Sequence, residues 1–168
     1  MKCIVAVDEN WGIGKDGELL FRISEDLKRF RSFTEHNAVI MGRKTLLSLP
    51  GGKPLKNRRS IVLSRNADYR VEHADVCASV EELLSLLKTP DYRDVEAYVI
   101  GGAEIYRLLL PYCSEAIVTH IRAMAAADCF FPDLKEEPGW EVIKEEPPNR
   151  DGDLSYQYVT YTNVSGRP

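Results

Sequence analysis

Short apolar runs alternate along the chain with segments that have the periodicity of amphipathic helices. Runs such as IVAV (4–7), AVIM (38–41) and AYVI (97–100) are apolar throughout, which is typical of strands covered on both faces of a sheet. The predicted strands are Cys3–Val7, Ala38–Met41, Ser60–Ser64, Asp75–Ala78, Ala97–Ile100 and Ala116–Ile121. The predicted helices are Ser24–Glu35, Lys44–Leu49, Val80–Lys88 and Ala103–Leu110.

This alternation predicts an α/β fold with a mixed, mostly parallel sheet of about eight strands and about four flanking helices. The end of the chain follows another pattern. Trp140–Glu146 and Ser155–Thr162 flank PPNRDGDL, whose turn residues indicate a loop between two antiparallel strands. We expect a single domain over residues 1–164, followed by a tail at 165–168.

The most informative position in the pattern is Asp26. In the helix Ser24–Glu35, for which Ser24 is placed as the cap, the apolar residues Ile23, Leu27, Phe30 and Phe33 fall on one side. Asp26 shares that side, whereas Glu25, Lys28, Arg29 and Arg31 are expected to point away. An aspartate is common in a first helical turn, where the helix dipole favours it. Among apolar groups, however, its pKa rises, which suits it to proton transfer or to binding a cationic ligand.

Composition narrows the class of protein. The chain has 168 residues, 44% hydrophobic and 29% charged, which fits one globular domain. No apolar run reaches the roughly 20 residues that span a bilayer, and the first residues do not form a signal peptide, so we expect a cytoplasmic protein. Cys3, Cys77, Cys113 and Cys129, and the three histidines, are dispersed. They predict buried thiols in a reducing compartment and no metal site.

Charge is distributed unevenly. Residues 1–70 carry 14 Lys and Arg against 8 Asp and Glu, whereas residues 71–168 carry 8 against 18. The overall acidity, with a net charge of −4, disfavours nucleic acid as a partner. A small anionic ligand bound by the first half remains compatible with this distribution.

Two strand-to-helix junctions resemble anion-binding turns. Gly42 ends one apolar strand and is followed by the sequence RKT (43–45), and Gly101 and Gly102 end another before Ala103. Free amides at a helix start attract phosphate, and glycine lets a ligand approach the backbone. No G-x-G-x-x-G motif directly joins a predicted strand to a predicted helix, so the Rossmann fingerprint is absent. Two such turns could still bind a dinucleotide.

A further group of strand-end residues and two loops are candidates for ligand binding. Arg43, Ser64 and Arg65 each lie at a strand end and could bind a further monophosphate, which would favour NADP over NAD. The segment Asn10–Arg22 carries three glycines and is long for a connection, which is typical of a lid. A second loop, PGGKPLKNRR (50–59), is basic and precedes a strand.

Taken in order, several segments make the chain resemble the bacterial-type dihydrofolate reductases. They are IVAVDENWGIGKDGELLF, SEDLKRF, VIMGRKT, PLKNRRSIVLSR, VIGGAEIY, LLP, THI and FFPDL. Each is weak alone, but their order and spacing across nearly the whole chain are specific. The resemblance implies reduction of 7,8-dihydrofolate to tetrahydrofolate by NADPH, binding of antifolate inhibitors, and a monomer that binds neither nucleic acid nor membrane.

The resemblance also assigns roles to individual residues. Asp26, supported by the Thr119 hydroxyl, matches the acid that binds the pterin, and Arg58 matches the arginine that binds the glutamate α-carboxylate. The walls of the substrate pocket are matched by Ile4, Val5, Ala6, Leu19, Leu27, Phe30, Leu49, Leu55 and Ile100. Contacts with NADPH are matched by Ala6, Ile13, Gly42, Arg43, Lys44, Thr45, Ser64, Arg65, Ile100, Gly102, Ala103, Glu104, Ile105 and Tyr106. Asp128 matches a residue that helps to close the lid, and the family joins its two glycines by a cis peptide bond, expected here between Gly101 and Gly102.

The chain departs from the family pattern in the lid. Leu20-Phe21 stands where many relatives have Pro-Trp, and Phe has no N–H donor to hold a water in the site. Leu19 stands where methionine is common. Two alternatives stay open: a pyrimidine reductase of riboflavin synthesis, which needs neither Asp26 nor Arg58, and a non-catalytic nucleotide-binding regulator. The regulator would leave a carboxylate on an apolar helix face without a function.

Overall fold

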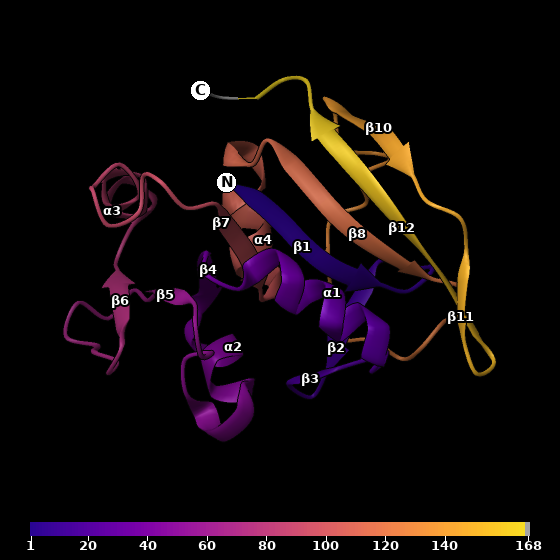
Figure 1. The fold of residues 1–168 in the computed structure, drawn as a ribbon, viewed down its shortest axis with the longest axis horizontal. Helices are drawn as coiled ribbons and strands as arrows, with labels where there is room; N and C mark the ends of the chain where they lie inside the picture. Colours follow the sequence, from indigo (N-terminus) through magenta and orange to yellow (C-terminus); the bar gives the residue numbers. More distant parts are fainter. Residues whose placement is uncertain (167–168) are drawn as a thin grey trace.

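The computed structural model describes residues 1–166 and is built around one large mixed sheet (Figure 1). The strand order is β10-β12-β8-β1-β7-β4-β5-β6, with β11 paired to β12. From β8 to β6 all neighbours are parallel, whereas β12 runs antiparallel to β8, β10 and β11. The predicted fold class is therefore confirmed. Of the expected tail at 165–168, Arg167 and Pro168 lie outside the described residues.

The bounds of the predicted elements differ from the observed ones by at most one residue at either end. The strands of the large sheet are β1 (Lys2–Val7), β4 (Ala38–Gly42), β5 (Arg59–Leu63), β6 (Ala74–Cys77), β7 (Ala97–Gly101), β8 (Glu115–Ile121), β10 (Trp140–Glu145), β11 (Asn149–Asp151) and β12 (Leu154–Asn163). The helices are α1 (Ser24–Thr34), α2 (Arg43–Ser48), α3 (Val80–Leu87) and α4 (Ala103–Leu109), with 3-10 turns at Pro50–Gly52 and Leu110–Tyr112. Within residues 1–166, no helix is both long and apolar enough to cross a bilayer.

Two segments expected to be loops contain short strands. The segment Asn10–Arg22 holds β2 (Gly12–Lys15) and β3 (Glu18–Leu19), which form a small antiparallel sheet with β9 (Cys129–Phe130). In PPNRDGDL, β11 pairs with the start of β12, so the connection is a tight hairpin. Strands of two to four residues carry too little alternation to be recognised from sequence.

The helices cover opposite faces of the sheet, and β4 shows how the sequence achieves this. Ala38 and Ile40 face the large core, to which α3 and α4 contribute Leu83 and Leu109. Their neighbours in the strand point the other way and pack with Leu46 of α2. Because side chains alternate along a strand, an entirely apolar β4 is needed to bury both faces.

Two helix starts differ in how they are capped. Ser24 was expected to cap α1, but it is the first helical residue, and Ile23 occupies the cap position without a side-chain hydrogen bond. In α3 the Ser79 hydroxyl accepts a hydrogen bond from the Glu82 amide at 3.1 Å, and the Glu82 carboxylate accepts one from the Ala78 amide at 2.7 Å. This reciprocal pair is a variant of the capping box, in which Glu82 accepts from the residue before the cap rather than from the cap itself, and it gives both amides an acceptor.

Replacing the cap of α3 should affect stability alone. We expect Ser79→Ala to lower the free energy of unfolding by about 1 kcal/mol, because one amide of the first turn loses its acceptor. Denaturant unfolding measures this loss. Ser85→Ala, a change within the same helix but outside the capping box, is the control. Equal losses in the two variants would contradict a capping role.

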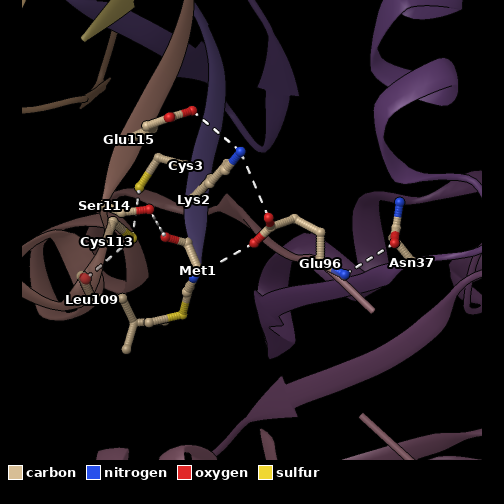
Figure 2. A network of polar contacts seen from close by, with 9 residues as sticks. All are labelled: Met1, Lys2, Cys3, Asn37, Glu96, Leu109, Cys113, Ser114 and Glu115. Carbon is tan, nitrogen blue, oxygen red and sulfur yellow. Dashed lines mark hydrogen bonds and ion pairs between the residues drawn. The ribbon is translucent and has the colours of Figure 1, made fainter. Parts of the chain in front are cut away.

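A network of polar contacts surrounds the start of β1 (Figure 2). The Met1 amino group lies 3.6 Å from the Glu96 carboxylate, and the Lys2 ammonium lies 3.3 Å from Glu115. The thiols of Cys3 and Cys113 lie 3.4 Å apart in the core. Their mutual hydrogen bond and burial raise the pKa of Cys3, so the thiol is unreactive. Cys3, Cys77 and Cys113 are buried as predicted, but Cys129 is exposed, so the prediction was wrong for it.

Candidate active site

The Asp26 carboxylate lies between α1 and the large sheet. Its Oδ1 accepts a 2.6 Å hydrogen bond from the hydroxyl of Thr119 on β8, which is itself buried. Burial raises the pKa of Asp26 above its ordinary value, while the Thr119 hydroxyl and the charge of Arg29 oppose the rise. The unusual carboxylate predicted from helical periodicity therefore lies on the face of α1 that packs on the sheet, and Thr119 is beside it.

Two neighbours on α1 do not lie where the helical pattern placed them. Leu27 was expected on the buried face, but its side chain is 43% exposed. Arg29 was expected to point away, but its guanidinium carbon lies 3.8 Å from the centroid of the Tyr158 ring on β12. The physical reason is that the long arginine stem can cover an aromatic surface while its charged end finds a partner.

The three predicted wall residues on β1 lie on both faces of that strand. Ile4 and Ala6 alternate with the buried Val5, which belongs to the large core on the far face. Ala6 lies on the face of Asp26, because it is the register partner of Thr119. Val5 therefore presents only its backbone toward this site.

The remaining apolar candidates come from separate elements. Leu49 and Ile100 each pack against the apolar cluster to which β4 and α2 contribute. Phe30 and Leu55 are half-buried, and Leu19 on β3 is 52% exposed. An exposed leucine is ordinary by itself, but Leu27 directly follows a partly buried carboxylate, which suits a flat, largely apolar ligand with a polar edge.

Arg58 is held in place beside the end of α1. Its Nε donates to the Thr34 hydroxyl at 3.2 Å, and one terminal nitrogen donates to the Lys56 carbonyl at 2.9 Å. Among residues 1–166 no carboxylate lies within ion-pair distance of Arg58. Burial lowers its pKa, but an arginine stays charged. A fixed, half-buried guanidinium with unused N–H groups is suited to bind a carboxylate.

The two glycine junctions meet at one edge of the sheet. Met41 and Gly101 are register partners in β4 and β7, so the turns that follow these strands are neighbours. A Cβ added at Gly102 would lie 3.5 Å from the Thr45 hydroxyl, and one at Gly42 would lie 3.0 Å from Ile105. Glycine at position 42 therefore permits the close packing of α4. The peptide bond between Gly101 and Gly102 is cis, as expected.

The neighbouring strand end adds the predicted phosphate ligands. Ser64 and Arg65 follow β5, which pairs with β4, and their position places them beside Arg43 at the same edge. Arg43 and Arg65 are exposed, and the Arg43 guanidinium carbon lies 5.1 Å from the Tyr69 ring centroid. Lys44 is exposed as well. Arg43, Lys44 and Arg65 therefore place three positive charges at this edge of the sheet.

Comparison with known proteins agrees with this arrangement. A family model described as "Dihydrofolate reductase" matches residues 1–164. The chain belongs to the dihydrofolate reductase family. It is 37% identical over 158 residues to the dihydrofolate reductase of Neisseria meningitidis serogroup A, with 94% of each chain covered. To that of Bacillus subtilis it is 34% identical over 155 residues, which are 92% of this chain and 88% of the relative.

A solved structure leads to the same family. Dihydrofolate reductase from Enterococcus faecalis complexed with NADP(H) and RAB-propyl superposes with a TM-score of 0.83 at 34% identity, covering 96% of this chain and 94% of that one. Membership of the dihydrofolate reductase family does not favour the riboflavin-type reductase or the non-catalytic regulator.

Among the residues that the family resemblance assigned to the cofactor, the Tyr106 side chain is buried in the core. Its hydroxyl donates to the Ile4 carbonyl at 2.8 Å, and its ring packs edge-on against Phe131. Ile13 and Ile105 also pack against the large core, whereas Ala103 is half-buried and Glu104 is exposed. Tyr106 therefore fixes the backbone of β1 at the position next to Val5.

In this member of the dihydrofolate reductase family, the predicted lid segment Asn10–Arg22 is paired with β9 through β2. The Asp16 amide donates to the Asp128 carboxylate at 2.9 Å, and this bond lowers the pKa of Asp128. The buried Asp8 holds the base of the segment by accepting from three amides, at 2.9, 2.8 and 3.1 Å. A Cβ at Gly12 would lie 2.7 Å from Ala127, so this position has room only for glycine.

Sequence reasoning missed two residues of the site region. The role of Asp8 had a local signal, because an aspartate directly after an apolar strand and before Gly12 is placed to bind turn amides. The inward placement of Arg29 had no such signal, because its aromatic partner is 129 positions away on β12.

Proposed function

We propose that the protein catalyses the NADPH-dependent reduction of 7,8-dihydrofolate to 5,6,7,8-tetrahydrofolate, and so supplies one-carbon metabolism. The observation that carries this proposal is the Asp26 carboxylate, hydrogen-bonded to Thr119 and followed by the exposed Leu27. Membership of the dihydrofolate reductase family, and the NADP(H) named for the Enterococcus faecalis protein, support it.

The residues at the sheet edge fit a phosphorylated dinucleotide. Gly42 and Gly102 leave the backbone accessible beside Thr45, and Arg43, Ser64 and Arg65 end or follow adjacent strands. We infer that the glycine turns bind the pyrophosphate and that the two arginines with Ser64 bind the additional phosphate of NADPH. When bound, NADPH supplies a hydride. The protein aligns the reactants and provides their electrostatic surroundings.

Asp26 acts on the other reactant. We infer that its carboxylate accepts hydrogen bonds from the pterin amino group and ring N3, while Thr119 fixes its orientation. A negative charge held there favours a proton on pterin N5, which must be gained as C6 receives hydride. Ile4, Ala6, Leu27, Phe30, Leu49, Leu55 and Ile100 would contact the flat rings, with Val5 contributing through its backbone and Leu19 from the lid.

The substrate's outer end would meet Arg58, whose free N–H groups match the α-carboxylate of the glutamate tail. Asp128 would hold the lid by the Asp16 amide. A protonated diaminopyrimidine antifolate would pair as a cation with Asp26. We further infer a cytoplasmic monomer whose residues 1–164 form one functional domain, with small molecules rather than nucleic acid or membrane as partners.

A spectrophotometric assay tests the function. Absorbance of NADPH at saturating concentration should fall when 7,8-dihydrofolate is added, and NADH should be a much poorer donor because it lacks the phosphate that Arg43 and Arg65 would bind. A pyrimidine intermediate of riboflavin synthesis is the competing substrate. Oxidation of NADPH with that compound and not with dihydrofolate would contradict the proposal, as would binding of NADPH without turnover of either.

A further inference from the structure

Arg29 is a charged residue packed against the active-site face of the sheet. It follows Asp26 by three positions, so both side chains lie on the same side of α1. Its side chain is only 25% exposed, and its guanidinium carbon lies 3.8 Å from the Tyr158 ring centroid and 5.2 Å from that of Phe33. A cation in contact with two aromatic rings is strongly restrained in position.

The second half of the chain fixes this position. A terminal nitrogen of Arg29 lies 3.0 Å from the Glu146 carboxylate, and Lys144 approaches the same carboxylate at 3.1 Å. Glu146 is itself held, because its amide donates to the Tyr158 carbonyl at 3.0 Å and its carbonyl accepts from the Gln157 side chain at 2.8 Å. The ring and the carboxylate that hold Arg29 are thus parts of one rigid unit.

The residues that hold Arg29 lie next to the residue that holds Asp26. Tyr158 on β12 is the register partner of Thr119 on β8, so the two side chains lie next to each other on one face. Thr119 donates to Asp26, and Tyr158 contacts Arg29. Asp26 and Arg29, one turn apart on α1, are therefore contacted by two register partners of the large sheet.

The charges around Asp26 can be named from each packed element. α1 contributes Arg29, and β12 contributes Tyr158 with Tyr156 behind it, while Glu146 and Lys144 lie beyond the guanidinium. Burial, and then the charge of Asp26, raise the pKa of Tyr158 to about 12, so this phenol is neutral at physiological pH. The positive charge of Arg29 acts on Asp26 and favours its ionised form.

The contacts of Arg29 also leave one donor unsatisfied. Its Nε is buried, and within residues 1–166 it has no hydrogen-bond partner. A buried N–H without an acceptor costs about 1–3 kcal/mol, so an apolar residue on the Tyr158 ring would be at least as good for packing alone. The arginine is therefore better explained by its charge than by its contribution to stability.

We propose that Arg29 is a positioning residue for the reaction: held by Tyr158 and Glu146, it places a permanent positive charge beside Asp26 and keeps that carboxylate ionised toward the substrate. This inference rests on the proposed function for the role of Asp26. Arginine suits the task because it stays charged at every pH at which the enzyme works, and because a partly buried charge is screened less than an exposed one.

Titration of Asp26 in the ligand-free protein tests the proposal directly. The carboxyl carbon of Asp26 is followed by NMR in the wild type, Arg29→Gln, Arg29→Lys and Lys28→Gln. Lys28 is the matched control, because it removes the same charge from the same helix at an exposed position. We expect Arg29→Gln to raise the pKa of Asp26 by about 1, Arg29→Lys to restore most of the wild-type value, and Lys28→Gln to leave it unchanged.

The pH profile of turnover should move with this titration. In Arg29→Gln it should shift to higher pH by the same amount as the pKa of Asp26, and in Arg29→Lys it should return. An unchanged Asp26 titration in Arg29→Gln would overturn the proposal, as would an Arg29→Lys variant that behaves like the glutamine variant, or a Lys28→Gln variant with an equal shift. If Arg29→Gln does not fold, Arg29→Met, which keeps an apolar stem on the Tyr158 ring, takes its place.

The two proposals fail separately. If the wild type does not oxidise NADPH with dihydrofolate, the proposed function fails, whereas the NMR titration still reports whether Arg29 controls Asp26. If the enzyme is active but the titration is insensitive to Arg29, only the positioning role fails.

Discussion

Asp26→Asn is expected to lower turnover of dihydrofolate at pH 7 by about 100-fold or more, since proton transfer assisted by a positioned group contributes that much. Asparagine has nearly the same shape and can still accept the hydrogen bond from Thr119, so the fold and NADPH binding should persist. It lacks the negative charge that favours a proton on N5. The remaining rate should therefore rise as the pH falls, because solvent protons then reach N5 directly.

The measurement is the pH dependence of single-turnover hydride transfer. Glu25→Gln is the matched control, because it removes an exposed carboxylate from the adjacent position. A pH–rate profile of Asp26→Asn that coincides with the wild-type profile would refute the catalytic role.

The same substitution has a consequence for stability. Burial raises the pKa of Asp26 in the folded state, so its ionisation opposes folding. The sign follows from linkage: this penalty is absent below the unfolded-state pKa, grows as the pH rises through the interval up to the folded-state pKa, and is fully present above it. Asp26→Asn should therefore unfold at a higher temperature than the wild type at pH 7 and show no such gain at pH 3. A variant that is less stable at pH 7 would contradict this expectation.

Arg58→Leu is expected to weaken binding of dihydrofolate by about 100-fold, which corresponds to the loss of two hydrogen bonds between charged groups. Hydride transfer within the saturated complex should change little, because Arg58 would bind the glutamate tail rather than the reacting rings. Separate measurements of substrate affinity and of pre-steady-state hydride transfer distinguish these effects.

Arg59→Leu controls for loss of positive charge in the same loop. Arg59 is exposed, and its guanidinium carbon lies 5.8 Å from the Tyr92 ring centroid. Its loss should leave substrate affinity within about twofold, as is usual for an exposed charge. A large drop in the hydride-transfer rate of Arg58→Leu would show that the arginine acts on the chemistry, contrary to its assignment.

Much of the fold followed from local patterns. The apolar runs of β1, β4, β5 and β7 and the helical periodicity of α1 to α4 gave element bounds within one residue, because burial on both faces of a sheet requires continuous apolar strands. The same reasoning selected Asp26, since a carboxylate in phase with apolar residues on a helix stands out in sequence alone. Thr119 did not stand out, because a threonine is an ordinary residue in a strand, and only the resemblance to a family assigned it a role.

Other features depended on contacts between distant segments. β2 and β3 pair locally, but β9 forms only by pairing with β2 across more than 110 positions, and Asp16 and Asp128 are brought together over a similar separation. Leu27 is exposed although its phase on the helix indicated burial, and it is Asp26 and Arg29 that contact the sheet, through Thr119 and Tyr158. Local sequence patterns were thus enough to identify the strands and helices and the one unusual carboxylate. The charge that lies near this carboxylate became visible only in the packed molecule, because it depends on how a helix and two strands distant in sequence come together.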